Sequence, residues 1–452
     1  MPEINPNEVH AATAELTSDA TLRLVRNGVA QEGVDKLSLD REQLRSLTPV
    51  TSHKLDSWGV ADQKASGRCW IFAGLNSLRG ELMDKAKLKD FELSQTYIYF
   101  FDKLEKANWF LSAMAELKDR DITDRTLTKL MDDPIGDGGQ WSMFVSLVEK
   151  YGVVPKYAMP ETASSEASAM LNRNLQTVLR RAAHQIRAGK SGAQEQALAD
   201  VYRILTANLS LPPKDFQWQY RDKDDEFHRA GTFTPQEFAK EYLPADLSEY
   251  VCVVNDPRNA YGKLYTVEYL GNVAGERVTY LNAPVEVLRD AARASIEDGQ
   301  PVWFGCDTDQ QSDDEHGVWA KHLHDYEAFY GVEMDLDKAQ RLRLHESLMT
   351  HAMVFTGADI GDDGTVNRWR VENSWGPKKA DKGFWTMADD WFDEFVFEIA
   401  VHPSRLPEQY QAALQSESAA AQSDGLAGAL DETGASADGA AADVDSLSDA
   451  IT

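Results

Sequence analysis

The stretch SGRCWIFAGLNSLRGEL, residues 66–82, places one of the three cysteines of the chain just ahead of a helical pattern. Its large aliphatic residues recur at intervals of four, three and four, the spacing of one face of an α-helix: Ile71, Leu75, Leu78 and Leu82. Cys69 therefore falls in the first turn of a predicted helix. Taken alone, such a cysteine is more often a small buried residue than a nucleophile. Its role depends on what the rest of the chain supplies.

The length of 452 residues allows two or three domains, or one large decorated domain with a substantial core. The three cysteines, Cys69, Cys252 and Cys306, are far apart in the sequence. They fit neither a disulfide framework nor a zinc site, because both need paired or clustered ligands. Cys252 and Cys306 alternate with apolar residues, so we expect both in the core. This cysteine usage favours a reducing compartment.

The charge and hydropathy of the chain exclude several classes of partner. Its beginning, MPEINPNEVHAATAEL, has no basic leader and no apolar run, and no segment approaches the roughly 20 apolar residues of a membrane span. The net charge of −28 disfavours nucleic acid and anionic membranes, because both would be repelled. We therefore expect a cytoplasmic protein with no membrane partner, and nucleic acid is an unlikely partner.

The first half of the chain has a helical character. Residues 1–50 are polar and predict an N-terminal arm, and residues 66–131 predict helices. The loop PIGDGGQW, residues 134–141, precedes another helix that is expected to end at Gly152 as its C-cap. Residues from about 161 to 250 are charged and rich in Ala and Gln, with no β pattern, which predicts an inserted helical subdomain.

The second half, from about residue 250 to 405, has a β character. Seven short segments are rich in Val, Tyr, Phe and Trp and are separated by turn residues: YVCVVN, KLYTVEYL, PVWFGC, HAMVFTGA, NRWRVENSW, GFWTM and FVFEIAVH. A helical half followed by a β half predicts an α+β fold with a cleft between two lobes. Residues 416–452 contain mainly Ala, Ser, Gly and Asp, and so predict an acidic, disordered C-terminal tail.

Three residues elsewhere in the chain, His351, Asn373 and Gln63, could complete an active site in which Cys69 is the nucleophile. His351 heads an apolar strand pattern and could accept the thiol proton, forming an ion pair, and later return it to the leaving amine. Asn373 comes 22 positions later and could orient the imidazole, with Trp375 excluding water from that contact. Gln63 and the backbone N–H of Cys69 could stabilise the oxyanion of acyl transfer. Together these residues favour a nucleophilic role for Cys69 over that of a cysteine that only fills the core.

The motifs around these four residues resemble the active-site signatures of papain-like cysteine peptidases. Longer strings resemble one branch, the bleomycin hydrolase and aminopeptidase C family, in order from about residue 50 to about 415: DQKASGRCWIFAGLNSLR, GDGGQWSMFVSLVEKYGVVPKYAMPE, VNDPR, DGQPVWFGCD and MTHAMVFTG. His351 follows Cys69 by 282 positions, against roughly 130 to 150 in ordinary papain relatives. The inserted region accounts for the excess.

The resemblance implies a papain-like two-lobed fold, with a helical lobe, an antiparallel β-barrel-like lobe and a large helical insertion. It implies that Cys69, His351 and Asn373 are catalytic, that Gln63 serves the oxyanion, and that Gly138 and Gly139 pair with the substrate backbone. It also implies peptide substrates, aminopeptidase activity in the cytoplasm, a homohexamer, and no metal or organic cofactor.

The C-terminus departs from the family. The resemblance implies that the chain ends in the cleft, where its carboxylate holds the free amino group of the substrate. Here Gly428, Ala429 and Leu430 match the usual terminal run, but the chain continues to Thr452. The tail could be trimmed, could loop through the cleft, or could leave the anchor lost and the specificity relaxed.

Two other classes of function stay open beside the aminopeptidase. One is a thiol hydrolase that cleaves internal peptide bonds or amide-bearing small molecules. The other is a catalytically silent binding or scaffold protein. A metal site at His316, His322 and His324 is disfavoured, because no cysteine lies nearby and the adjacent acids fit a solvated loop.

Overall fold

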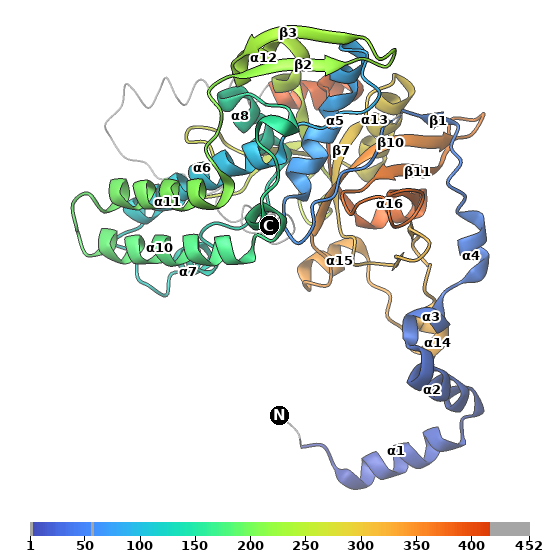
Figure 1. Ribbon diagram of the computed structural model, residues 1–452. Helices are drawn as coiled ribbons and strands as arrows, with labels where there is room; N and C mark the ends of the chain where they lie inside the picture. Colours follow the sequence, from blue (N-terminus) through green and yellow to red (C-terminus); the bar gives the residue numbers. More distant parts are fainter. Residues whose placement is uncertain (1–2, 56–57, 416–452) are drawn as a thin grey trace.

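The computed structural model describes residues 3–55 and 58–415 of the chain. The helices of residues 95–209 lie on one side of the molecule, and the large sheet, with further helices beside it, lies on the other, where the N-terminal segment also projects (Figure 1). The predicted tail, residues 416–452, lies outside the described residues. Among the helices of the described ranges, none combines the length and the apolar character that a membrane crossing requires.

The N-terminal arm contains four short helices, of which α1 and α2 bury no residue. They are α1 (Pro6–Ser18), α2 (Ala20–Glu32), α3 (Val34–Ser38) and α4 (Arg41–Ser46). Side-chain oxygens of Asn5, Asp19 and Asp40 cap three of their N-termini. The arm joins the body where Leu39 forms a β-bridge with His324. Its helices therefore depend on local capping more than on packing.

The helical lobe surrounds α5 (Cys69–Lys85), the helix predicted from the opening stretch. Three further helices follow it: α6 (Gln95–Glu116), α7 (Arg125–Asp132) and α8 (Trp141–Tyr151). Helix α5 is buried along most of its length between these helices and the sheet. Helix α8 ends at Gly152, whose φ is 72° and where a Cβ would lie 2.2 Å from the backbone of Pro235. The predicted glycine C-cap is confirmed.

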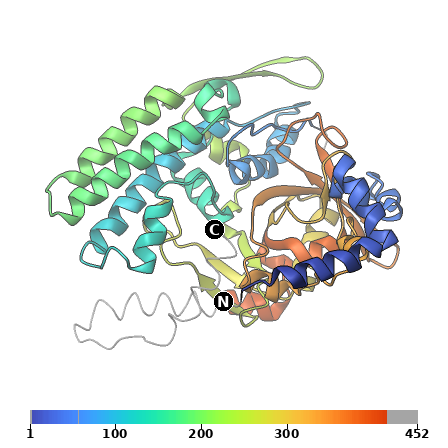
Figure 2. The same ribbon diagram turned by 90° about the horizontal axis from the view of Figure 1, so that it is seen from below.

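The inserted region contains four helices and a hairpin. They are α9 (Ala163–Glu166), α10 (Ala169–Arg187), α11 (Ala193–Leu209), β2 (Phe216–Arg221), β3 (Phe227–Phe233) and α12 (Pro235–Tyr242). Helices α10 and α11 pack against α6, and Figure 2 shows all three on the side away from the sheet. The expectation of no β structure between residues 161 and 250 was wrong, because β2 alternates: Phe216 and Trp218 are buried while Gln217 is exposed.

The sheet of the β lobe is mainly antiparallel and follows the order β5-β6-β4-β13-β7-β10-β11-β12-β9-β8, with β1 also paired to β10. Only the β4–β6 and β12–β9 pairs among these strands are parallel. Its strands are β1 (His53–Lys54), β4 (Val251–Val254), β5 (Lys263–Thr266), β6 (Thr279–Asn282), β7 (Val302–Cys306), β8 (Ser312–Asp313), β9 (Val318–Trp319), β10 (His351–Ile360), β11 (Val366–Glu372), β12 (Phe384–Ala388) and β13 (Val396–Val401). All seven predicted β segments contribute a strand.

Four helices accompany the sheet: α13 (Val285–Glu297), α14 (Tyr326–Tyr330), α15 (Lys338–Arg343) and α16 (Asp389–Phe395). One face of the sheet packs against α13 and α16, and β7 and β10 contact α5 through the other face. A buried ion pair reinforces this second contact, since Arg79 of α5 binds Glu372 of β11 and both side chains are at most 1% exposed. Trp58 donates its indole N–H to the same carboxylate. The helix that carries Cys69 is thereby fixed to the β lobe.

Candidate active site

Three of the predicted residues lie at the ends of neighbouring elements. Cys69 is the first residue of α5, His351 is the first of β10, and Asn373 directly follows β11. Strands β10 and β11 are antiparallel, with Val354 opposite Glu372, so the start of β10 lies beside the end of β11. The packing of α5 against β10 brings the cysteine to the same place. Residues far apart in the sequence therefore meet between the lobes.

His351 and Asn373 form a buried hydrogen-bonded pair. The Nε2 and Oδ1 atoms are 2.9 Å apart, and the two residues are 6% and 0% exposed. Because Oδ1 can only accept, Nε2 carries a hydrogen and Nδ1 of the neutral ring is left as an acceptor. Oδ1 also accepts the backbone N–H of Ser374 at 2.7 Å, which fixes the amide. Trp375 stacks on the imidazole with 4.9 Å between ring centroids, as its predicted shielding role requires.

Cys69 is a free, partly exposed thiol that lines the same cavity as His351. Burial raises the pKa of the thiol, and the backbone N–H groups of Ala352 and Trp70 oppose this rise. Burial lowers the pKa of His351 to about 4, while the hydrogen bond to Asn373 acts in the opposite direction. Burial thus favours an uncharged thiol and an uncharged imidazole, and a neutral imidazole is the form that can accept a proton.

Gln63 is held between the segment before Cys69 and the segment after Asn373. Its Nε2 donates to the backbone oxygen of Ser66 at 2.6 Å, and its backbone N–H donates to the backbone oxygen of Ser374 at 2.8 Å. Ser374 also donates its hydroxyl to Oε1 of Gln63. Gln63 is 7% exposed, and it is not among the residues that line the cavity. Its amide is therefore rigidly oriented.

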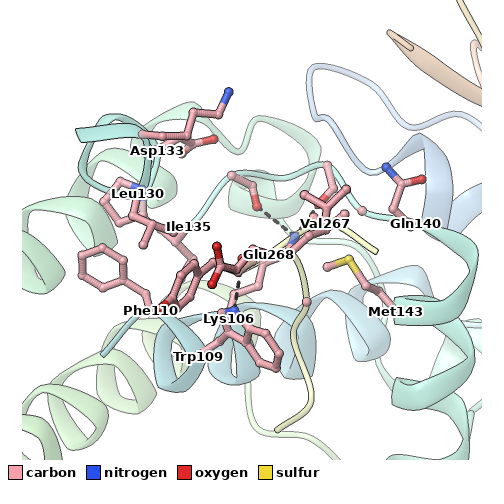
Figure 3. A pocket seen from close by; sticks show the side chains of 18 of the residues that line it. Lys106, Trp109, Phe110, Leu130, Asp133, Ile135, Gln140, Met143, Val267 and Glu268 are labelled. Carbon is pink, nitrogen blue, oxygen red and sulfur yellow. Dashed lines mark hydrogen bonds between the residues drawn. The ribbon is translucent and has the colours of Figure 1, made fainter. Parts of the chain in front are cut away.

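A cavity of about 430 Å³ opens beside Cys69 and His351. Its walls come from α6, α7, the loop before α8, the segment after β5 and the start of β10. Figure 3 shows mainly large apolar side chains around it: Trp109, Phe110, Leu130, Ile135, Met143 and Val267. Such a volume, apolar with a few polar groups, is typical of small-molecule and peptide sites.

The two predicted substrate glycines line this cavity but differ in their surroundings. A Cβ at Gly138 would meet no atom within 4 Å, so this residue borders open space. A Cβ at Gly139 would lie 2.6 Å from the ring of Trp70, the residue after Cys69. Gly139 is therefore needed for packing, whereas the protein itself leaves room beside Gly138.

Charged residues of the cavity were not found from the sequence. Lys106 of α6 donates to the backbone oxygen of Gly136 at 3.1 Å and also to that of Gly138. Glu268, in the segment after β5, directs its carboxylate toward the cavity (Figure 3). Lys106 lies in the predicted helical region and Glu268 in the predicted segment KLYTVEYL, but neither pattern indicates that the side chain reaches a cavity.

The other cysteines and two of the histidines considered as a metal site are explained by burial or by hydrogen bonds. Cys252 and Cys306 are 2% and 0% exposed, as expected of core residues. His316 contacts the carboxylate of Asp313 at 2.7 Å, and His324 contacts the hydroxyl of Ser38 at 3.1 Å. Ordinary hydrogen bonds thus account for both histidines.

The two lobes, with a thiol and an imidazole facing one cavity between them, define a cysteine peptidase of papain-like fold. The comparisons agree. PepW from Lactobacillus rhamnosis, a solved structure, superposes with a TM-score of 0.89 at 38% identity and covers 92% of this chain and 96% of its own. Aminopeptidase C of Listeria monocytogenes is 43% identical over 82% of this chain and 86% of its own length. Human bleomycin hydrolase is 38% identical over 92% of this chain and 96% of its own length.

The chain belongs to the Peptidase C1-like family, whose model matches residues 3–424.

Proposed function

We propose that the protein is a thiol aminopeptidase that removes N-terminal residues from peptides. The observation that carries this proposal is the cavity that Cys69 and His351 both line, with His351 hydrogen-bonded to Asn373. The expectation that cleavage begins at the N-terminal end of the peptide comes from the names of the relatives, because enzymes named aminopeptidase C match most of the chain.

In the proposed mechanism, His351 accepts the thiol proton through Nδ1 as the sulfur of Cys69 attacks the peptide carbonyl. The N-terminus of α5 favours the developing thiolate. The backbone N–H of Cys69 and the second N–H of the Gln63 amide stabilise the oxyanion. The imidazolium then returns its proton to the leaving amine, and water hydrolyses the acyl-enzyme with His351 again as the base. Asn373 keeps the ring oriented throughout, and Gly138 and Gly139 hold the substrate backbone.

The buried surroundings of His351 support its role as a base. A ring with a pKa of about 4 is unprotonated at neutral pH, so its Nδ1 is free to accept the thiol proton. No metal or organic cofactor takes part in any of these steps.

A panel of substrates tests the proposal. Aminoacyl amides with a free amino group should be hydrolysed faster than their N-acetylated counterparts by the full chain. Forms that end at Leu430 and near Glu417 test whether the tail changes this preference. Faster cleavage of the blocked substrates would instead establish the endopeptidase alternative. No labelling of Cys69 by thiol-reactive peptide probes would favour the silent binding protein.

We further propose a cytoplasmic location and a homohexamer, both from the resemblance to the family. Light scattering on the purified protein tests the assembly, and a monomer at micromolar concentration would contradict it. Fractionation of the source cells tests the location.

A further inference from the structure

Asp137 lies in the loop before α8, directly ahead of the two cavity glycines, and its side chain is 10% exposed. Its carboxylate is bound on both oxygens. Oδ1 accepts from Tyr99 at 2.8 Å, Asn172 at 2.7 Å and Lys103 at 2.8 Å; Oδ2 accepts from the Gly67 backbone at 3.0 Å and from Ser168. The partners come from α6, from the inserted region and from the segment before Cys69.

The carboxylate is kept ionised in this buried place. Burial disfavours its charge, but the Lys103 ammonium and the donors Ser168 and Asn172 outweigh burial and hold the pKa of Asp137 well below its usual range. Lys103 itself is 0% exposed and also donates to the backbone oxygens of Ile135 and Gly136, each at 2.8 Å. The ion pair therefore holds the side chain and the backbone of the loop at once.

The same residue reaches both flanks of the nucleophile. Its carboxylate accepts the N–H of Gly67, two positions before Cys69, and its backbone oxygen accepts the indole N–H of Trp70, one position after it, at 2.7 Å. Asp137 thus joins the glycine loop to the start of α5 at two points, and the packing of Trp70 against Gly139 adds a third contact. A change at this residue would alter the separation between Cys69 and Gly138.

We propose that Asp137 is a positioning residue that sets the distance between the nucleophile and the substrate-binding glycines. This inference rests on the proposed function. The position requires a charge as well as a shape, because asparagine would leave Lys103 buried without its counter-ion. The main effect should fall on substrate binding, since no hydrogen bond joins Asp137 to the imidazole or the sulfur, although its charge contributes to the raised pKa of the Cys69 thiol.

The test compares Asp137→Asn with Asp256→Asn. Asp256 is a matched control: it is 3% exposed, binds Arg258 at 2.9 Å and does not line the cavity. Active-site titration with a thiol alkylator gives the folded fraction, and kcat and KM are then expressed per active site. Asp137→Asn should raise KM for a free peptide about tenfold or more and should not slow the alkylation of Cys69, because removing the carboxylate charge lowers the pKa of the thiol. Asp256→Asn should lower the folded fraction without moving KM.

A milder variant and a binding measurement complete the design. Asn172→Ala removes one donor from Oδ1, so it should raise KM in the same direction by a smaller factor even if Asp137→Asn fails to fold. The dissociation constant of a peptide, measured on Cys69→Ala with and without Asp137→Asn, gives the same answer without turnover. Unchanged KM and unchanged peptide affinity would overturn the positioning role. A wild-type protein that binds peptides but hydrolyses none would overturn the proposed function alone.

Discussion

Replacing Gly138 and Gly139 separately by alanine should separate substrate contact from packing. Neither glycine has a positive φ, so alanine can adopt both backbone conformations. The added methyl group at position 139 would lie 2.6 to 2.8 Å from three ring atoms of Trp70, against 3.4 to 4 Å for an ordinary contact. Either the ring or the loop must move by nearly 1 Å.

Trp70 cannot make this movement freely. It is 1% exposed, its indole N–H is bound to the oxygen of Asp137 at 2.7 Å, and its own backbone oxygen accepts from Trp303 at 3.3 Å. Overpacking of this kind costs about 1 to 3 kcal/mol. We expect Gly139→Ala to lose that much free energy of unfolding, and to lose activity because Trp70 adjoins Cys69.

Gly138→Ala should behave in the opposite way. Its methyl group meets only open space, so the free energy of unfolding should stay within about 0.5 kcal/mol of wild type or rise slightly. Substrate, however, would meet the methyl group, and the loss of one backbone hydrogen bond, about 1 kcal/mol, predicts a fall in kcat/KM of roughly fivefold.

Urea unfolding followed by tryptophan fluorescence gives the stabilities, and initial rates on a free aminoacyl substrate give kcat/KM. A Gly139→Ala protein as stable as wild type would refute the packing argument. A Gly138→Ala protein with wild-type kcat/KM would refute the assignment of that glycine to substrate.

Three further predictions concern single side chains. Cys69→Ala should abolish turnover and leave the urea midpoint unchanged; wild-type activity would remove the mechanism. Asn373→Asp should raise the pKa of His351 above its value of about 4, because a carboxylate favours the imidazolium, so the acid limb of kcat/KM should move to higher pH by about one unit. Burial raises the pKa of Glu398 to about 8, so the folded chain keeps a proton that the unfolded chain loses above about pH 4.3, and stability falls as pH rises toward 8. The stability advantage of Glu398→Gln over wild type should therefore grow by on the order of 3 kcal/mol between pH 5 and 8 in urea unfolding; a constant difference would contradict this.

Local periodicity made much of the fold predictable. The helix after Cys69, the C-cap at Gly152 and the seven β segments follow from patterns within about a dozen residues, and all are present. The hairpin β2–β3 was missed because its alternation covers few residues after a long Ala- and Gln-rich stretch. The order of the strands was not predictable, since the placement of β13 between β4 and β7 depends on contacts between distant segments.

The site was predictable only in part, because some of its residues are defined by contacts between distant segments. Cys69, His351 and Asn373 belong to motifs that could be recognised, and the structure places them together. Asp137 was overlooked within a quoted loop, because its importance comes from partners dispersed between residues 67 and 172. Burial and pairing of charge, which distinguish this aspartate from the neighbouring Asp133, are properties of the folded chain that no spacing rule expresses.

The ion pair between Arg79 and Glu372 has a consequence for the synthesis of the protein. The arginine leaves the ribosome almost 300 residues before the glutamate, and the histidine and asparagine of the site also come late in the chain. Until β10 and β11 emerge, the thiol of Cys69 has no imidazole beside it, and α5 lacks its buried ion pair with the second lobe. The cavity that Cys69 and His351 line together can therefore form only after most of the polypeptide has been synthesised.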